Sequence, residues 1–253
     1  MISCLTVTQP SRFPLLALAI GDFTAQTHGD AELVLLHDAD AAFDAQLNVL
    51  VRRHASARIR VHCAPSGTSL GLLRNASVAL AQGEYVCQWD DDDRHHPQRL
   101  ALQYAAMVEQ QADACFLSDQ LHWFPAQHEL YWDDWDREPY PFNFVQGTLL
   151  ARRTAMPAYP DLARGEDTGL AHALLRSGAR VARLRDCGWA YVYVYHGGNV
   201  FDAAHHAAIS RLKRYGGARL LARESLLRQR LAEYAPPLGA LRMPWEGGAL
   251  TCA

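Results

Sequence analysis

YVCQWDDDD, residues Tyr85–Asp93, places four consecutive aspartates directly after a short apolar run. Side chains alternate along an extended chain, so Asp90 and Asp92 are expected on one side and Asp91 on the other. Hard divalent ions such as Mg²⁺ or Mn²⁺ are held by one or two carboxylates, with water and substrate phosphates completing the shell. The stretch therefore indicates a buried strand that ends in a metal site for a phosphate-bearing ligand. A solvated acidic turn explains the same aspartates equally well when they are taken alone.

The first hundred residues alternate between strand-like and helix-like patterns. Strands are expected at 2–8, 32–37, 58–62 and 84–89, and helices at 13–26, 42–54 and 70–82. Such alternation predicts an α/β fold, a mostly parallel sheet with helices on both faces. Ligands bind beyond the carboxyl ends of the strands in sheets of this kind. The polar residues that follow three of these strands should therefore converge: Thr8 with Arg12, the run His37–Asp40, and the Asp90 cluster.

After Pro97 the pattern changes to a helix near 97–111 and strand-like runs near 114–119 and 145–151. The segment Trp132–Phe142 between them is aromatic, acidic and interrupted by prolines, which indicates a functional loop whose rings could stack on sugars. Simple packing of half-buried aromatic rings is the commoner explanation. We interpret the pairs His95-His96 and His205-His206 as solvated, because neighbouring side chains diverge.

Composition limits the class of protein. The chain has 253 residues, 49% of them hydrophobic and 20% charged, with a net charge of -3. These values are typical of a soluble α/β domain and argue against a nucleic-acid-binding protein. The six cysteines form no C-x-x-C pair and are expected to be buried free thiols. Because there is no signal sequence and no run of about 18 apolar residues, we expect a cytoplasmic protein.

Residues 203–234 are helical in pattern and strongly basic, and Gly216-Gly217 is expected to divide them into two helices. A basic amphipathic helix can lie on an anionic membrane surface, so peripheral membrane contact is one interpretation. A solvated, charge-rich helix face is the commoner one.

Three further stretches give the acidic cluster a context. In Leu70–Asn75, Gly71 at a helix start would let backbone approach a phosphate, and Arg74 and Asn75 would donate to phosphate or ribose oxygens. Gly165-Glu166-Asp167 precedes a helical run that ends near Gly178, and Tyr195–Asn199 follows a strand-like Tyr/Val stretch.

With these motifs in place, the chain resembles the family 2 glycosyltransferases of the GT-A fold over roughly its first 200 residues. The resemblance rests on the order and spacing of the motifs already quoted, together with Ala25-Gln26-Thr27, Glu32–Asp40 and Gly83-Glu84-Tyr85. The chain departs from the family pattern at His37, at Asp40 and at Gln9-Pro10-Ser11, which leaves recognition of the donor base open. The Gln-x-x-Arg-Trp signature of processive synthases is missing after Asp167, which favours transfer of a single sugar.

The resemblance implies a Rossmann-like GT-A sheet in two halves and a C-terminal extension. Residues 1–97 would bind the nucleotide sugar, 98–202 would form the acceptor and catalytic half, and 203–253 would be a helical tail. It implies a metal-dependent, inverting enzyme that uses Mn²⁺ or Mg²⁺. This enzyme would move one sugar from a nucleotide diphosphate donor to a hydroxyl of a glycan, lipid-linked sugar or small molecule. A UDP-sugar is the favoured donor, with GDP- and dTDP-sugars as alternatives.

The resemblance also assigns roles to residues. Asp38 would bind the donor base, Asp90 the ribose and metal, Asp92 the metal, and Asp167 would be the general base. His196 would contact the metal or the diphosphate. The remaining candidates for the donor site are Thr8, Arg12, Asp40, Gly71, Arg74 and Asn75.

Four alternatives stay open. Acidic residues at a helix start are favoured by the helix dipole, so capping accounts for Glu166-Asp167 on pattern alone, and a hydrogen-bonded structural histidine accounts for His196. A nucleotidyltransferase uses a similar sheet and metal carboxylates. A catalytically silent GT-A module would bind a nucleotide sugar or glycan as a scaffold.

Overall fold

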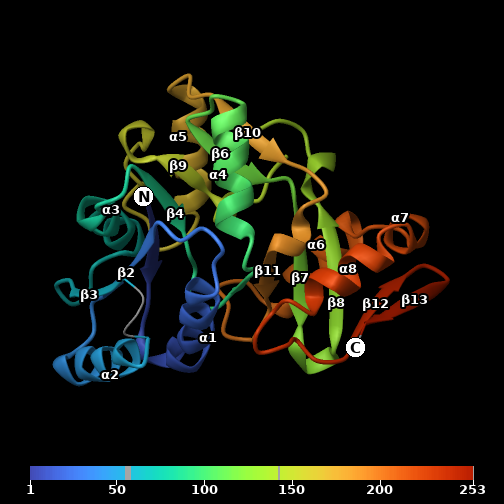
Figure 1. Cartoon of the computed structure of the whole chain (residues 1–253), viewed down its shortest axis with the longest axis horizontal. Coiled ribbons are helices and arrows are strands. Elements are labelled where there is room, and N and C mark those ends of the chain that lie inside the picture. The colour runs from blue at the N-terminus through green and yellow to red at the C-terminus, as the bar shows by residue number, and fades with distance from the viewer. Residues whose placement is uncertain (55–57, 142, 253) are drawn as a thin grey trace.

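The computed structural model describes residues 1–54, 58–141 and 143–252, which form two sheets side by side (Figure 1). The first sheet has seven strands in the order β10-β6-β9-β4-β1-β2-β3. Its strands, in chain order, are β1 (Ile2–Val7), β2 (Ala31–His37), β3 (Ile59–Cys63), β4 (Tyr85–Gln88), β6 (Ala114–Leu117), β9 (Leu150–Arg152) and β10 (Val181–Leu184).

The first sheet is mostly parallel, as the sequence predicts. Strand β1 runs parallel to β2 and β4, β2 to β3, and β10 to β6, whereas β9 is antiparallel to both of its neighbours. The register pairs Val7 with Leu36 and Leu5 with Gln88. The carboxyl ends of β1, β2 and β4 are therefore level at one edge of the sheet.

Five helices cover both faces of this sheet: α1 (Phe13–Thr24), α2 (Ala41–Arg52), α3 (Leu70–Leu80), α4 (Arg99–Glu109) and α5 (Glu166–Arg176). The side chains of Cys4, Leu33 and Cys87 face α1, α2 and α4, and the alternate residues Leu5 and Val86 face α3. This alternation along buried strands is the period of two expected for an extended chain.

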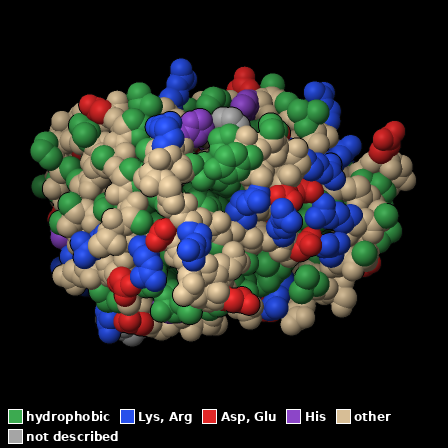
Figure 2. Space-filling view, turned by 90° about the horizontal axis from the view of Figure 1, so that it is seen from above, with side chains coloured by type: hydrophobic (Ala, Val, Ile, Leu, Met, Phe, Trp, Pro, Cys, Tyr) green, Lys and Arg blue, Asp and Glu red, His purple; other side chains and the backbone are tan. Residues whose placement is uncertain are grey.

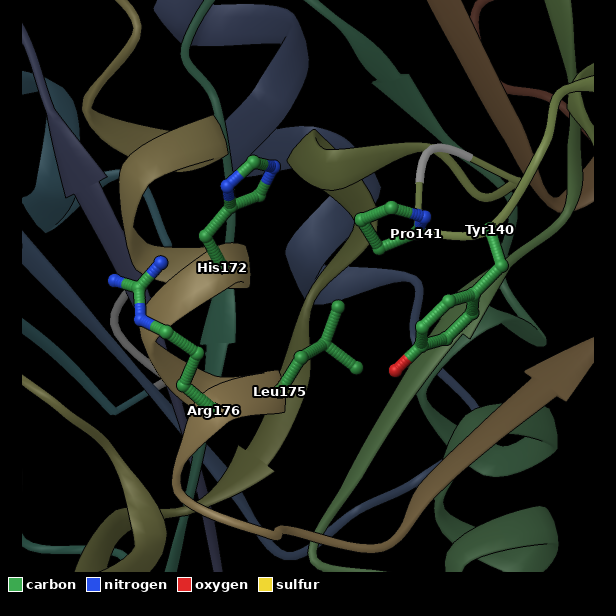
Figure 3. Close-up of a pocket in the computed structure, with 5 residues that line it drawn as sticks. All are labelled: Tyr140, Pro141, His172, Leu175 and Arg176. Atoms are coloured by element: carbon green, nitrogen blue, oxygen red, sulfur yellow. The ribbon is translucent and has the colours of Figure 1, made fainter.

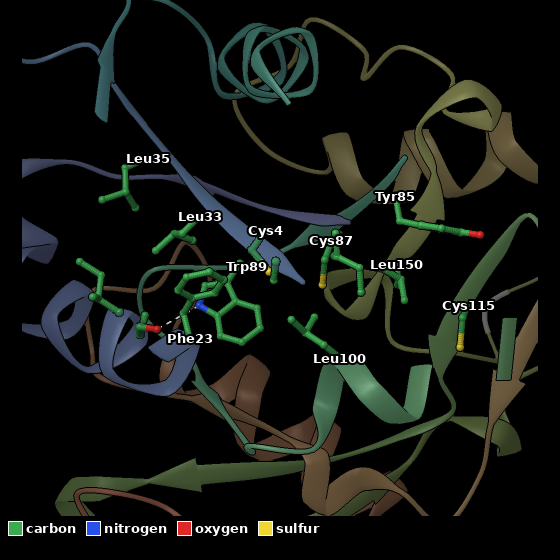
Figure 4. Packing of buried hydrophobic residues seen from close by; sticks show 14 of the residues in the cluster. Cys4, Phe23, Leu33, Leu35, Tyr85, Cys87, Trp89, Leu100, Cys115 and Leu150 are labelled. Atoms are coloured by element: carbon green, nitrogen blue, oxygen red, sulfur yellow. Dashed lines mark hydrogen bonds between the residues drawn. The ribbon is translucent and has the colours of Figure 1, made fainter. Parts of the chain in front are cut away.

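The larger core cluster is centred on Trp89, the residue before the acidic run (Figure 4). Its ring packs edge-on against Phe23 at 6.0 Å between centroids, and its Nε1 donates to the Ala19 carbonyl at 3.1 Å. Because Trp89 is completely buried, the chain emerges from the core at Asp90. Burial of this aromatic side chain fixes where the acidic run begins.

The second sheet, in the order β13-β12-β8-β7-β11-β5, is not predicted from the sequence. It consists of β5 (Arg94–His95), β7 (Asp119–Phe124), β8 (Glu129–Asp134), β11 (Tyr191–Val194), β12 (Leu241–Trp245) and β13 (Gly248–Cys252). Most of its strands pair antiparallel, but β7 is parallel to β11 and β12 to β8. The GT-A expectation of a mostly parallel sheet thus holds for the first sheet only.

The prediction of a functional loop over Trp132–Phe142 is wrong for its first three residues. Trp132, Asp133 and Asp134 belong to β8, and Trp132 is fully buried with its Nε1 donating to Asp119 Oδ2 at 2.5 Å. The packing explanation is therefore the correct one for this ring. Tyr140, 69% exposed, does project from the segment, and Phe142 lies outside the described residues.

The expectation that His95 and His96 are solvated is also wrong, because both are fully buried. The chain turns inward directly after Asp93 to form β5, and the His95 ring packs on Trp89 at 3.8 Å between centroids. Burial lowers the pKa of His96 to about 4 and the pKa of His95 well below its usual range. His206 is likewise buried, whereas His205 is exposed.

The C-terminal segment is helical only in part. The break at Gly216-Gly217 is present, but three helices follow Asp202, namely α6 (Ala203–Lys213), α7 (Gly217–Leu221) and α8 (Glu224–Leu231). The expected helical tail then ends in the β12–β13 hairpin, which joins the second sheet beside β8. In β12, buried Leu241 and Met243 flank exposed Arg242, the alternation of a strand. Ala253 lies outside the described residues.

Basic side chains of α7 and neighbouring segments pair with carboxylates of the protein. Arg219 contacts Asp134 at 2.6 Å and Asp186 at 3.1 Å, and Arg223 contacts Asp186 at 2.7 Å. In the space-filling view, blue Lys and Arg side chains alternate with red Asp and Glu side chains (Figure 2). Within the described residues, no helix is long and apolar enough to cross a membrane.

The cysteines are free thiols, as expected. Four of them, Cys4, Cys87, Cys115 and Cys252, are buried, but Cys63 at the end of β3 is exposed. The prediction of burial is wrong for Cys63, and Cys187 is only half-buried.

Candidate active site at the strand ends

Three neighbouring strand ends meet at one edge of the first sheet, as the alternating pattern predicts. Thr8 follows β1, Asp38 follows β2, and Asp90 follows β4. The Thr8 backbone N–H donates to Leu36 at 2.9 Å, and the Thr6 hydroxyl donates to the Trp89 carbonyl at 2.6 Å. Thr8 itself is only 4% exposed, so its side chain lies beneath the edge rather than open to a ligand.

The four aspartates divide into two pairs. Asp90 and Asp92 keep partly open carboxylates, with 22% and 18% of their side chains exposed, whereas Asp91 and Asp93 are buried. Asp90 accepts from Arg74 at 2.9 Å and from Gln88 at 2.8 Å. The expected separation of Asp90 and Asp92 from Asp91 is therefore present, although Asp90 and Asp92 have different partners.

Burial and charge give the aspartates different affinities for protons. Burial, aided by the negative charge of Asp92, raises the pKa of Asp91 to about 8. Burial likewise raises the pKa of Asp93 well above its usual range, and Asp93 accepts from the Tyr191 hydroxyl and from Val194 N–H at 2.9 Å. Burial opposes ionisation of Asp92, but its hydrogen bond with His196 and the charge of Arg12 outweigh it and lower the pKa. Asp92 therefore favours the ionised form, in contrast to its buried neighbours Asp91 and Asp93.

Arg12 and His196 complete the surroundings of Asp92. His196 Nε2 lies 3.2 Å from Asp92 Oδ2. Arg12 Nη1 contacts both Asp92 and His196, and its Nη2 donates to the Gly198 carbonyl at 3.1 Å. The histidine is held by its own backbone N–H, which donates to Asn199 Oδ1 at 2.9 Å.

Asp92 and His196 could hold a hard divalent cation that completes its shell with diphosphate and water, in the place where the Arg12 guanidinium contacts both side chains. Asp92 and His196 together supply one carboxylate and one imidazole at the open edge. Asp90 is turned to Arg74 and Gln88, and across the described ranges no three His, Cys, Asp or Glu side chains are grouped to hold a metal by themselves. A cation here would depend on ligands from the substrate.

Gly71, Arg74 and Asn75 contact protein where the sequence suggested phosphate or ribose. Gly71 N–H donates to the Leu162 carbonyl at 3.0 Å, and Arg74 binds Asp90 and Glu166. Asn75 donates to the Tyr159 carbonyl at 2.9 Å and accepts from Tyr159 N–H at 2.8 Å. Gly71 and Asn75 connect α3 to the segment that precedes α5, and Arg74 connects it to Asp90 and to the first turn of α5.

Asp38 and Asp40 differ in their surroundings. Asp38 Oδ2 accepts from Gly67 N–H at 3.0 Å, and the residue is half-buried at the edge. Asp40 is the N-cap of α2, and its Oδ1 accepts from Phe43 N–H at 3.0 Å. His37 is fully buried and lies 3.2 Å from Asp44, so its departure from the family pattern is a packing feature under α2.

Asp167 lies in the first turn of α5 and is half-buried. The N-cap of the helix is Gly165, and Asp167 Oδ1 accepts from the Thr168 backbone N–H at 2.7 Å, so this carboxylate bonds an amide of the first turn. Glu166 instead binds Arg74 at 2.8 Å, and the same guanidinium binds Asp90. Asp167 therefore follows directly on a residue that is tied to the acidic cluster.

A cavity of about 210 Å³ lies along the later turns of α5 and contains none of the predicted site residues (Figure 3). In Figure 3, the Leu175 side chain of α5 points toward the Tyr140 ring, which comes from the facing segment. The lining residues are Tyr140, Pro141, His172, Leu175 and Arg176.

Comparison with known sequences defines the class of protein. Residues 11–146, more than half of the chain, match the family described as glycosyl transferase family 2. The protein belongs to this family, and its fold is that of the GT-A glycosyltransferases.

Three solved structures illustrate the shared fold at low sequence identity. Residues 1–349 of TarS from S. aureus, in complex with UDP, are 15% identical with a TM-score of 0.60, covering 92% of this chain and 79% of that one. The mannosyltransferase PcManGT from Pyrobaculum calidifontis, in complex with GDP-Man and Mn2+, is 14% identical with a TM-score of 0.61, covering 93% and 73%. GalNAc-T7 with UDP, GalNAc and Mn2+ is 12% identical with a TM-score of 0.58, covering 77% and 44%.

Proposed function

We propose that this glycosyltransferase is metal-dependent and inverting, and that it moves a single sugar from a nucleotide diphosphate donor to an acceptor hydroxyl. The observation that carries the proposal is the arrangement at one sheet edge. Asp92 lies beside His196, and Asp90 shares Arg74 with the residue that precedes Asp167. The complexes of TarS with UDP and of PcManGT with GDP-Man and Mn2+ support this donor class. A UDP-sugar is the favoured donor, with GDP- and dTDP-sugars as alternatives.

The donor would lie across the ends of β1, β2 and β4, within the 1–97 half. Asp38 would contact the base, and Arg12 and His196, which lie beside Asp92, would contact the diphosphate. Asp92 and His196, with Asp90 nearby, would hold Mn²⁺ or Mg²⁺, which supplies positive charge to stabilise the departing diphosphate. Arg12 adds a guanidinium that matches phosphate oxygens.

In the proposed reaction, the acceptor oxygen attacks the anomeric carbon from the face opposite the diphosphate, and Asp167 accepts the hydroxyl proton. The bond from the anomeric carbon to the diphosphate oxygen breaks, and the nucleoside diphosphate leaves with the bonding electrons. One carboxylate is sufficient for this inverting displacement, whereas a retaining double displacement needs a second, nucleophilic group.

The acceptor would be bound by the 98–202 half and would be a glycan, a lipid-linked sugar or a small molecule. Cytoplasmic location and peripheral membrane contact through residues 203–253 stay predictions. The ion pairs of Arg219, Arg223 and Arg228 reduce the basic charge that these helices can offer to anionic lipids.

A thermal-shift panel tests the proposal. UDP, GDP, dTDP and CMP and their sugars are compared with and without Mn²⁺, because a ligand that binds only the folded state raises the melting temperature. One nucleoside diphosphate should raise it in the presence of Mn²⁺, and no shift with any of them would contradict the proposal. Product analysis then separates the alternatives, since a nucleotidyltransferase releases pyrophosphate from a nucleoside triphosphate and a silent module releases nothing.

A further inference from the structure

We propose that Asn75 and Gly71 on α3 are positioning residues. By holding residues 159–162 against α3, they fix the position of the Asp167 carboxylate at the start of α5. The inference rests on the proposed function, because it assumes that Asp167 is the general base. It assigns to α3 a role in proton transfer in place of direct contact with the donor.

The side-chain amide of Asn75 forms two hydrogen bonds with the backbone of Tyr159. Its amide nitrogen donates to the Tyr159 carbonyl at 2.9 Å, and its amide oxygen accepts from the Tyr159 N–H at 2.8 Å. This two-way contact resembles one rung of a β-ladder, and few other side chains offer a donor and an acceptor in this geometry. The Tyr159 ring is buried in the same core cluster as Leu170 and Leu174 of α5.

Gly71 allows the closest approach of the two segments. A Cβ added at Gly71 would lie 1.9 Å from the Pro160 carbonyl oxygen and 3.1 Å from the Leu162 nitrogen. Its N–H donates to the Leu162 carbonyl at 3.0 Å, and Ser69 at the start of α3 contacts Asp161. On the other side, a Cβ at Gly169 of α5 would lie 2.7 Å from Pro160 Cγ. Residues 159–162 are therefore clamped between α3 and α5 with no space for a side chain at either glycine.

Arg74, between these two residues on α3, ties the same region to the acidic cluster. It is 11% exposed and binds Asp90 at 2.9 Å and Glu166 at 2.8 Å. Its guanidinium lies 5.8 Å from the centre of the Tyr159 ring. Successive residues of one helix thus hold the strand-end carboxylate, the first turn of α5 and the segment that leads into α5.

Residues 156–165 contain no helix or strand. The entry of the chain into α5 is therefore fixed by side-chain and backbone contacts of this kind rather than by a regular element. Displacing a catalytic group by about 1 Å costs on the order of 10²-fold in rate. Donor ligands at the ends of β1, β2 and β4 lie on other segments, so loss of the clamp should lower the rate of transfer and leave nucleotide binding intact.

The test compares Asn75→Ala with Asn48→Ala. Asn48 is also a half-buried helical asparagine, but its amide bonds only within α2, to Asp44. Three quantities are measured with Mn²⁺ present: the Kd of UDP and GDP, the rate of their release from UDP-N-acetylglucosamine and GDP-mannose with water as acceptor, and hydrogen exchange at Tyr159 N–H. We expect Asn75→Ala to lower the release rate at least about 10-fold, to leave Kd within about 3-fold and to speed exchange, while Asn48→Ala changes none of them.

A rise in Kd that accounts for the whole loss of rate would make Asn75 a donor ligand and overturn the inference. An unchanged release rate would overturn it as well. The exchange measurement needs no donor, so unchanged protection at Tyr159 in Asn75→Ala contradicts the clamp even if the wild-type protein binds no nucleotide. Failure of the proposed function, in contrast, is seen in the wild-type protein as absence of both binding and release.

A second pair of variants tests the same inference even if Asn75→Ala fails to fold. Gly71→Ala should push residues 159–162 off α3 and lower the release rate with Kd preserved. Gly21→Ala in α1 is the control, because a Cβ there meets nothing within 4 Å. Equal release rates in the two glycine variants would contradict the inference.

Discussion

His196 Nε2 lies 3.2 Å from Asp92 Oδ2, a contact that joins segments 104 residues apart in the sequence. Asp92 follows β4 of the first sheet, and His196 follows β11 of the second, so the contact bridges the two sheets. A ligand bound to both Asp92 and His196 would therefore contact segments from both sheets.

Asp92→Asn should remove the Mn²⁺ dependence of nucleoside diphosphate binding. The substitution keeps the size of the side chain but deletes the negative charge that a divalent cation requires. Calorimetric titration of UDP and GDP with and without Mn²⁺ measures the effect. Asp30→Asn is the control, because Asp30 is an exposed residue at the amino end of β2. Wild-type metal dependence in Asp92→Asn would place the cation elsewhere.

Asp167→Asn should lower sugar transfer by on the order of 10²–10⁴-fold, because it removes a general base. Nucleoside diphosphate affinity should stay within a few-fold, because a base acts in the transition state. Steady-state rates and equilibrium titrations of the same preparation separate the two effects. A parallel loss of affinity and rate would give Asp167 a structural role.

Folding stability should depend on pH through Asp119. This carboxylate is 1% exposed, and burial raises its pKa to about 6, although it accepts from Trp132, Tyr215 and Cys187. The unfolded chain has the ordinary pKa of about 3.9, so the folded state binds the proton more tightly. The stabilisation is present below pH 4 and is lost as the pH rises from about 4 through about 6.

Urea unfolding of the wild type and Asp119→Asn isolates this effect. Between pH 5 and pH 7.5, the free energy of unfolding of the wild type should fall by about 1 kcal/mol relative to the variant. A constant difference between the two proteins over that range would show that Asp119 has the same proton affinity in the folded and unfolded states.

Gly188→Ala should destabilise the second sheet. A Cβ at this position would lie 2.5 Å from Trp132 Nε1 and 2.9 Å from the Gln120 backbone nitrogen. Overpacking of this kind typically costs about 1–3 kcal/mol. Gly29→Ala, where a Cβ meets nothing within 4 Å, is the matched control in chemical denaturation. Equal stability of the two variants would mean that Trp132 can move without cost.

The first sheet could be predicted because its strands and helices alternate locally along the chain. The second sheet could not, because its local pairs β7–β8 and β12–β13 are joined by pairings between segments far apart in the sequence, such as β12 with β8 through Arg242 and Glu129. Buried polar residues such as Asp133 and His95 also conceal its period-two pattern. Local patterning therefore identified most strands of the first sheet, but not β10, and in the second sheet chiefly the Tyr/Val stretch that forms β11.

The site shows the same division. The acidic run could be found because a cluster of four carboxylates is visible within a few residues, whereas Asp167 is singled out only by the family resemblance, since capping accounts for it on pattern alone. The partners of Gly71, Arg74 and Asn75 could not, because a glycine that admits a phosphate and one that admits another chain segment have the same local sequence. Asn75 and Tyr159 are 84 residues apart, and nothing near Asn75 indicates that partner.

The most direct measurement is the anomalous diffraction of manganese in crystals grown with Mn²⁺ and the nucleoside diphosphate that the thermal-shift panel selects. The account predicts a manganese peak at coordination distance from the Asp92 carboxylate and the diphosphate, with His196 beside it and Asp167 facing the same cleft. A peak remote from Asp92, or a diphosphate bound away from the ends of β1, β2 and β4, would contradict it.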